Sequence, residues 1–178
     1  SRTLPGEGNL AGVGRLDVNF LTVLAKTPGL GTSAVQILFR QHNVIGQPSN
    51  WTPGGASGSY FFMDSLQNEN NSTLNIVSFQ QGLLDDRVVL SVGKMHPNQF
   101  FMLNFYANDE SRQFLNGSFD GNSVFQPAQG TYSPGFVTQI VPCDNIYINA
   151  GIFDIADYPG NSFQNINDGL YWAGVEVG

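Results

Sequence analysis

The chain has few charged residues, a single cysteine and no long apolar run. Charged side chains make up 12% of its 178 residues, about half the usual share for a soluble protein. No stretch approaches the ~20 consecutive apolar residues that a membrane-spanning helix needs. The lone Cys143 excludes an internal disulfide framework. The net charge of −7 argues against a nucleic-acid partner, because such partners require basic patches.

Glycine and phenylalanine are abundant instead. The chain contains 21 glycines and 14 phenylalanines, while its hydrophobic content is an ordinary 41%. Aromatic residues favour strands, and a low charge content leaves little to cover helix surfaces. The composition therefore favours an all-β protein, and at this length we expect one domain over residues 1–178.

Seven segments alternate apolar and polar residues with a period of two, the pattern of a strand with one apolar face. In the segment 145–153, for example, Ile146, Ile148 and Ile152 alternate with Tyr147 and Asn149. The predicted strands are Arg15–Leu24, Ser33–His42, Thr73–Gln81, Arg87–Lys94, Phe136–Val141, Asn145–Phe153 and Leu170–Gly178.

Short and long connections alternate between these segments. Short turns at 27–31, 82–86 and 142–145 are interleaved with long connections at 43–71, 95–133 and 154–169. This predicts an up-and-down antiparallel sheet whose two ends face different environments, as in outer-membrane barrels. A soluble β-sandwich that binds carbohydrate is the alternative, because its strands alternate in the same way. The periodicity indicates an amphipathic sheet without naming the solvent on either face.

The connection 95–133 is too long to be a simple link, and loops of this length usually have a function. Its aromatic rings suit the C–H faces of a sugar, and its amides and charges suit hydroxyl groups. A local salt bridge, turn capping by asparagine and pinning of the loop by phenylalanine are the structural alternatives. We expect the loop to fold inward and to contact substrate through Phe105, Asn108, Asp109, Glu110, Arg112, Gln113 and Asn116.

The polar faces of the strands supply a second set of candidates. In a barrel, they would face the lumen. Trp172 beside Glu176 would then offer a sugar a ring face with a polar group next to it, or Trp172 would lie at the membrane interface. Lys94 has the parity of the apolar face, so either it lies at the rim or a bulge at Gly93 turns it inward. The candidate lumen residues are Arg15, Asp17, Asn19, Gln36, Arg40, Asn149, Trp172 and Glu176.

Enzymatic and metal-binding patterns are weak in this sequence. His42 and His96 lie in different segments, without metal-ligand spacing. The carboxylate pairs 85–86 and 109–110 are adjacent, and adjacent strand residues point to opposite faces, unlike the facing pair of a glycosidase. We therefore predict no catalytic residue, no metal site and no cofactor, and a protein that is not an enzyme.

Residues 79–178 resemble the carbohydrate-selective outer-membrane porins of the OprB type. The most specific part is the string Ala-Asn-Asp-Glu-Ser-Arg-Gln-Phe-Leu-Asn at 107–116, which follows a strand ending in Val-Gly-Lys94. The segments 132–136, 142–154 and 171–178 add to the likeness, and 12–41, with its Pro-Gly-Leu-Gly turn, is similar to a preceding hairpin of the same family.

The resemblance implies an up-and-down transmembrane β-barrel of about sixteen strands in the bacterial outer membrane. It also implies passive diffusion of small carbohydrates or similar neutral solutes past a constriction of inward-folded loops. Seven strands cannot close such a barrel, and open sheet edges are not tolerated in hydrocarbon. The expected partners are therefore saccharides, outer-membrane lipid and further barrel strands from the rest of the protein or another chain. A closed eight-stranded barrel with one missed strand is the second reading.

Overall fold

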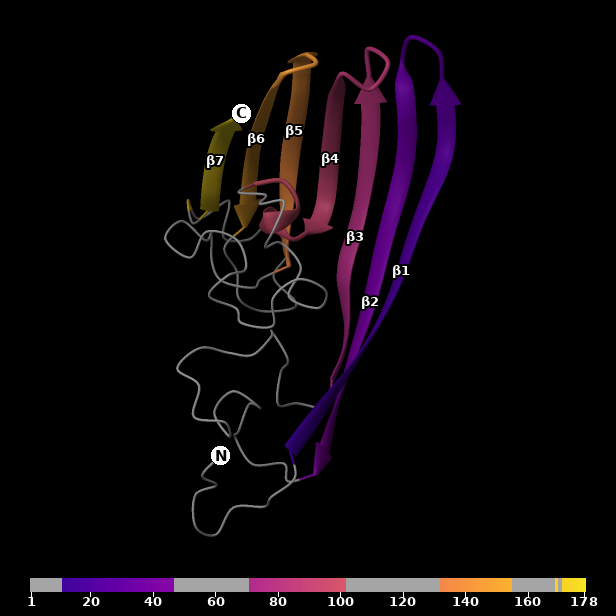
Figure 1. Cartoon of the computed structure of the whole chain (residues 1–178), viewed down its shortest axis with the longest axis vertical. Coiled ribbons are helices and arrows are strands. Elements are labelled where there is room, and N and C mark those ends of the chain that lie inside the picture. The colour runs from indigo at the N-terminus through magenta and orange to yellow at the C-terminus, as the bar shows by residue number, and fades with distance from the viewer. Residues whose placement is uncertain (1–10, 47–70, 102–131, 155–168, 170) are drawn as a thin grey trace. The chain divides into compact units, whose positions relative to one another are not determined.

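The computed structural model describes residues 11–46, 71–101, 132–154, 169 and 171–178 (Figure 1). Its seven strands form one antiparallel sheet in the order β1-β2-β3-β4-β5-β6-β7. The strands are β1 (Ala11–Thr27), β2 (Gly31–Gly46), β3 (Asn71–Leu83), β4 (Val88–Met95), β5 (Ser133–Cys143), β6 (Ile146–Asp154) and β7 (Tyr171–Val177). A single turn of 3₁₀-helix, η1 (Pro97–Gln99), follows β4. The chain divides into a first unit (1–18, 39–73 and 103–125) and a second unit (19–38, 74–102 and 126–178).

All seven predicted strands are present in the predicted order, but their bounds needed correction. The predicted segments have 6–10 residues, whereas β1 has 17 residues and β7 has 7. Glycine, alanine and lysine weaken the alternation of apolar and polar residues. The sequence pattern therefore misses strand ends at which the backbone still pairs. Pro142 and Cys143, expected in a turn, belong to β5, where the register with β6 shifts between Ile140 and Cys143.

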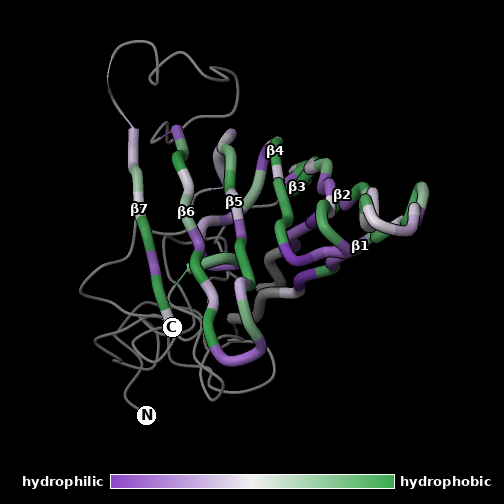
Figure 2. Tube along the Cα trace, turned by 90° about the horizontal axis from the view of Figure 1, so that it is seen from above, coloured by the Kyte–Doolittle hydropathy of each residue, from purple (hydrophilic) through white to green (hydrophobic). Residues whose placement is uncertain are grey.

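In the second unit, the strands β4 to β7 have two contrasting faces. One row across the sheet joins Val92, Phe136, Ile152 and Ala173, and the adjacent row joins Ser91, Val137, Gly151 and Gly174. We call the side of the first row the apolar face and the side of the second the covered face. Hydrophobic and hydrophilic residues alternate along these strands (Figure 2). Phe136 is 42% exposed on the apolar face, whereas Ser91 is fully buried on the covered face.

The residues after β4 pack on the covered face. Met95, Phe100 and Phe101 form a buried cluster with Val137 of β5 and Phe153 of β6. This cluster is the start of the connection predicted at 95–133. Residues 102–131 of that connection lie outside the described residues, so its inward folding stays a prediction.

Lys94 keeps the parity of the apolar face. The register runs without a shift through Gly93 on both neighbouring strands, which rules out a bulge there. Lys94 lies next to the last residue of β4, and its ammonium donates to the Leu74 carbonyl at 2.8 Å. The bulge alternative is therefore wrong, and Lys94 lies at the end of its strand, as the rim alternative requires. Along β3 the exposed positions change parity between Leu74 and Val77, which explains the blurred alternation of that segment in the sequence.

The turn between β3 and β4 is joined to the turn between β1 and β2 by two carboxylates. Asp85 accepts from the Gly29 N–H at 2.7 Å. Asp86 accepts from the Thr32 N–H at 2.6 Å and from the Thr32 hydroxyl at 2.8 Å. Both aspartates adopt positive φ values, 55° and 66°, which non-glycine residues rarely do. The two turns are thus linked by side-chain acceptors rather than by strand pairing.

The carboxylate of Asp86 makes this link sensitive to acid. Hydrogen bonds from the Thr32 backbone and hydroxyl, aided by the charge of Lys26, lower the pKa of Asp86 below its usual 3.8. The ionised Asp86 carboxylate stabilises the link. This stabilisation is fully present above pH 3.8 and is lost as the pH falls through the lowered pKa. We expect Asp86→Asn to speed amide hydrogen exchange in the peptide 27–32 at neutral pH. The difference from the wild type should shrink towards pH 3.

Asp144→Asn, in the turn between β5 and β6, is the matched control and should leave exchange at 27–32 unchanged. Equal exchange in Asp86→Asn and the wild type at neutral pH would contradict the link.

Candidate functional site

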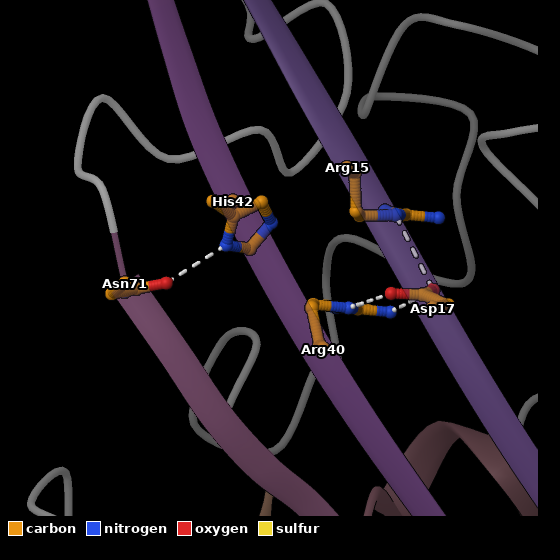
Figure 3. Close-up of polar contacts among 5 residues, drawn as sticks. All are labelled: Arg15, Asp17, Arg40, His42 and Asn71. Atoms are coloured by element: carbon orange, nitrogen blue, oxygen red, sulfur yellow. Dashed lines mark hydrogen bonds and ion pairs between the residues drawn. The ribbon is translucent and has the colours of Figure 1, made fainter.

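A charged cluster lies on the first unit's strands (Figure 3). Arg40 of β2 donates to Asp17 of β1 through Nε at 2.8 Å and Nη2 at 3.0 Å, a two-pronged pairing. Arg15 of β1 places its Nε 3.4 Å from the same carboxylate. Arg15 and Asp17 share a strand face because they are two residues apart. The cluster therefore holds two guanidinium groups around one carboxylate.

His42 and Asn71 adjoin this cluster (Figure 3). The His42 ring lies two residues beyond Arg40 on β2, and its Nδ1 is 3.1 Å from the Asn71 Oδ1 at the start of β3. His42 is 3% exposed, and its buried Nε2 has no hydrogen-bond partner among the described residues. A buried nitrogen without a partner lowers stability.

The second unit continues the polar pairing between β1 and β2. The Gln36 amide donates to Asn19 Oδ1 at 3.2 Å. The side chains that pair between β1 and β2 are therefore neutral amides in the second unit and charged groups in the first unit.

An aromatic cluster occupies the covered face of β5 to β7. The Phe101 ring meets Trp172 edge to face, with centroids 5.0 Å apart, and Phe153 lies 5.9 Å from the same indole. Glycines in the sheet leave room for these rings, because a Cβ at Gly174 would lie 2.4 Å from Trp172 and one at Gly135 would lie 2.4 Å from Phe153. The rings therefore lie close against the sheet, and Trp172 is only partly buried.

Polar side chains adjoin these rings on the covered face. Asn149 of β6 donates to the Phe100 carbonyl at 2.6 Å and accepts from Gln139 at 3.4 Å. Tyr147 donates its hydroxyl proton to Glu176 of β7 at 2.9 Å. Trp172 and Glu176 share the covered face because they are four residues apart on one strand. Of these side chains, Trp172 and Glu176 are partly exposed, and an indole on the same strand face as a carboxylate suits a ligand with both C–H faces and hydroxyls.

The structure brings the strand candidates together in pairs and leaves the loop candidates undescribed. Asp17 contacts Arg15 and Arg40, Asn19 contacts Gln36, and Asn149, Trp172 and Glu176 share the covered face. The loop candidates Phe105, Asn108, Asp109, Glu110, Arg112, Gln113 and Asn116 lie outside the described residues.

The sequence analysis missed Phe101, Phe153 and the His42–Asn71 contact. Phe153 and Asn149 are four residues apart on β6, so they lie on the same side of the strand, and the isoleucines of β6 lie on the other side. This alternation could have placed Phe153 on the covered face. The glycines at 135, 151 and 174 could have indicated where aromatic rings lie against the sheet. Nothing in the sequence relates Phe101 to β6, because that contact depends on how the chain turns after β4.

Two further features concern only the described part of the chain. There, no group of three His, Cys, Asp or Glu side chains is placed to hold a metal ion. The described residues also include no helix with the length and apolar character needed to cross a membrane. Cys143 is exposed at the end of β5.

Comparison with known proteins gives one match. The family model of the carbohydrate-selective porins, OprB family, matches residues 8–176. No curated protein and no solved structure matches the chain. The match covers the charged cluster, the covered face and all but the last residue of β7. The family accounts for an antiparallel all-β chain with one apolar face, and we conclude that the chain belongs to the OprB family of carbohydrate-selective porins.

Proposed function

We propose that this chain forms part of the wall of a bacterial outer-membrane channel through which small carbohydrates diffuse passively. In this arrangement the apolar face contacts lipid and the covered face contacts the lumen. The main support is the burial pattern of the second unit, in which apolar residues are exposed on one face and polar residues are buried on the other. Val175 is 73% exposed and Val92 44% exposed on the apolar face, whereas Ser91 and Asn149 are buried on the covered face. A continuous exposed apolar surface marks an interaction with membrane or protein.

The sheet edges support further barrel strands as partners. Within the described residues, β1 and β7 each pair with a single neighbouring strand. An edge in hydrocarbon leaves N–H and C=O groups without partners, at a cost of several kcal/mol each. The proposal therefore includes additional strands, from the rest of the protein or another chain, that pair with both edges.

The soluble β-sandwich is less well supported. A sandwich needs a second sheet packed on the apolar face. In the described ranges all seven strands belong to one sheet, and Val92, Phe136 and Val175 of the apolar face are exposed.

The charged cluster suits passage of neutral solutes. Asp17 lies between Arg15 and Arg40, so a lumen lined by these residues presents both signs of charge. An ion must lose water beside an opposing charge, while a sugar exchanges its water for hydrogen bonds of similar strength. In the proposal, Asp109, Glu110 and Arg112 of the connection 95–133 complete this constriction from the loop side, and Asn108, Gln113, Asn116 and Phe105 contact the sugar.

Trp172 provides the sharpest test of sugar binding. Its indole is partly exposed on the covered face, with Glu176 on the same strand face. Stacking on an aromatic ring contributes about 0.5–1.5 kcal/mol. We expect Trp172→Ala to weaken sugar block of the ion current in planar bilayers about 2- to 10-fold, with single-channel recording as the measurement.

Tyr171→Ala is the matched control. Tyr171 is the preceding residue of β7 and is 49% exposed on the apolar face. Its replacement should leave sugar block unchanged. An unchanged block in Trp172→Ala, in a protein that still forms open channels, would show that the covered face does not bind the sugar.

A further inference from the structure

The 3₁₀-turn after β4 is capped by a histidine. His96 Nδ1 accepts from the Asn98 N–H at 3.2 Å, and the Gln99 side chain accepts from the His96 N–H at 3.4 Å. The usual capping residues are serine, threonine, aspartate and asparagine. These residues keep an acceptor at every pH between 5 and 8, whereas histidine changes its charge in this range.

The cap requires a neutral imidazole. Nδ1 accepts a hydrogen bond only when it carries a lone pair, so the ring proton must be on Nε2. In the imidazolium both nitrogens are donors, and Nδ1–H would oppose the Asn98 N–H. The positive charge would also lie at the N-terminal end of the turn, where a cation is unfavourable.

The cap directs two aromatic rings onto the covered face. Pro97 accepts from the N–H groups of Phe100 at 3.0 Å and Phe101 at 3.2 Å. Phe100 is 5% exposed and Phe101 is 3% exposed, and Phe101 meets Trp172 with centroids 5.0 Å apart. The turn therefore helps to hold Phe101 against the indole, together with the hydrogen bond from Asn149 to the Phe100 carbonyl.

Among the described residues, few titratable groups lie at this end of the sheet. Tyr132 packs against the His96 ring, with centroids 4.9 Å apart. The other titratable residues at this end of the sheet, within the described ranges, are Lys94 of β4, Asp154 of β6 and Tyr171 of β7. Histidine is the only one of these residue types that ordinarily titrates between pH 5 and 8.

We propose that His96 is a pH-sensitive positioning residue. Its neutral ring holds the segment 95–101 on the covered face, and its protonation releases Phe101 from Trp172. The proposal concerns the packing of this segment and is independent of the proposed transport function.

Trp172 fluorescence tests the proposal in the full-length protein in detergent micelles. These 178 residues contain two tryptophans, so Trp51→Phe, combined with Trp→Phe at every tryptophan of any further part of the protein, gives a background in which only Trp172 emits. Between about pH 8 and pH 5, the range of histidine titration, we expect a reversible shift of the emission maximum to longer wavelength. Far-UV circular dichroism should show an unchanged strand content.

Two variants in this background decide the origin of the shift. His96→Asn keeps an acceptor at all pH values and should show the pH 8 spectrum throughout. His96→Ala lacks the acceptor and should show the pH 5 spectrum throughout. A transition that persists in His96→Asn, or a wild type without any transition, would overturn the proposal. If His96→Ala does not fold, the comparison of His96→Asn with the wild type still decides the matter.

Discussion

Replacing Val175 with arginine should destabilise the protein by about 2–4 kcal/mol in a lipid bilayer, the cost of a cation at the bilayer midplane. Val175 is 73% exposed on the apolar face. It shares a row with Leu90, Thr138 and Ala150, and the last two lie midway along β5 and β6. In a soluble protein, so exposed a site would tolerate arginine within about 0.5 kcal/mol. The substitution therefore separates a lipid-facing sheet from a water-facing one.

The measurement is a guanidinium titration of the complete protein refolded into phosphatidylcholine vesicles. Asp144→Arg introduces the same side chain in the turn between β5 and β6, outside the strands. It should cost about 0–1 kcal/mol, as near a membrane interface. Equal and small losses in both variants would argue that the apolar face does not contact hydrocarbon.

Phe153→Ala should have the largest effect on stability, a loss of about 3–5 kcal/mol. Phe153 is 1% exposed and lies in the buried cluster, with its centroid 6.4 Å from Phe101. Its ring fills the space above Gly135. Surrounding rings held by the sheet and by η1 cannot collapse fully into the gap, so the cavity adds to the lost transfer energy.

Phe136→Ala removes the same ring from β5 on the apolar face, where Phe136 is 42% exposed. In the proposed arrangement lipid chains fill the space that this ring leaves, so the loss should be clearly smaller than for Phe153→Ala. The same guanidinium titration compares the two. A larger loss for Phe136→Ala would mean that the covered face is not the packed side of the sheet.

The sequence by itself determined the seven strands, their order and the two faces of the sheet. The side-chain period of a strand is two, so Ile146, Ile148 and Ile152 fall on the side opposite Asn149 whatever the rest of the chain does. The same rule brings Arg15 and Asp17 to one face. The family also followed from the sequence, because its strings are local and do not depend on how strands pair.

Only the tertiary structure decided which residues meet across the strands. The pairing of Asp17 with Arg40 depends on the register of β1 and β2, which a period of two fixes only to within steps of two residues. The contacts of Phe101 with Trp172 and of Asp86 with Thr32 join residues far apart in the chain. They depend on the direction the backbone takes at a capped turn and at residues with positive φ. Hydropathy carries no information on that direction, because it reports which side of a strand is apolar and not where the chain goes when the strand ends.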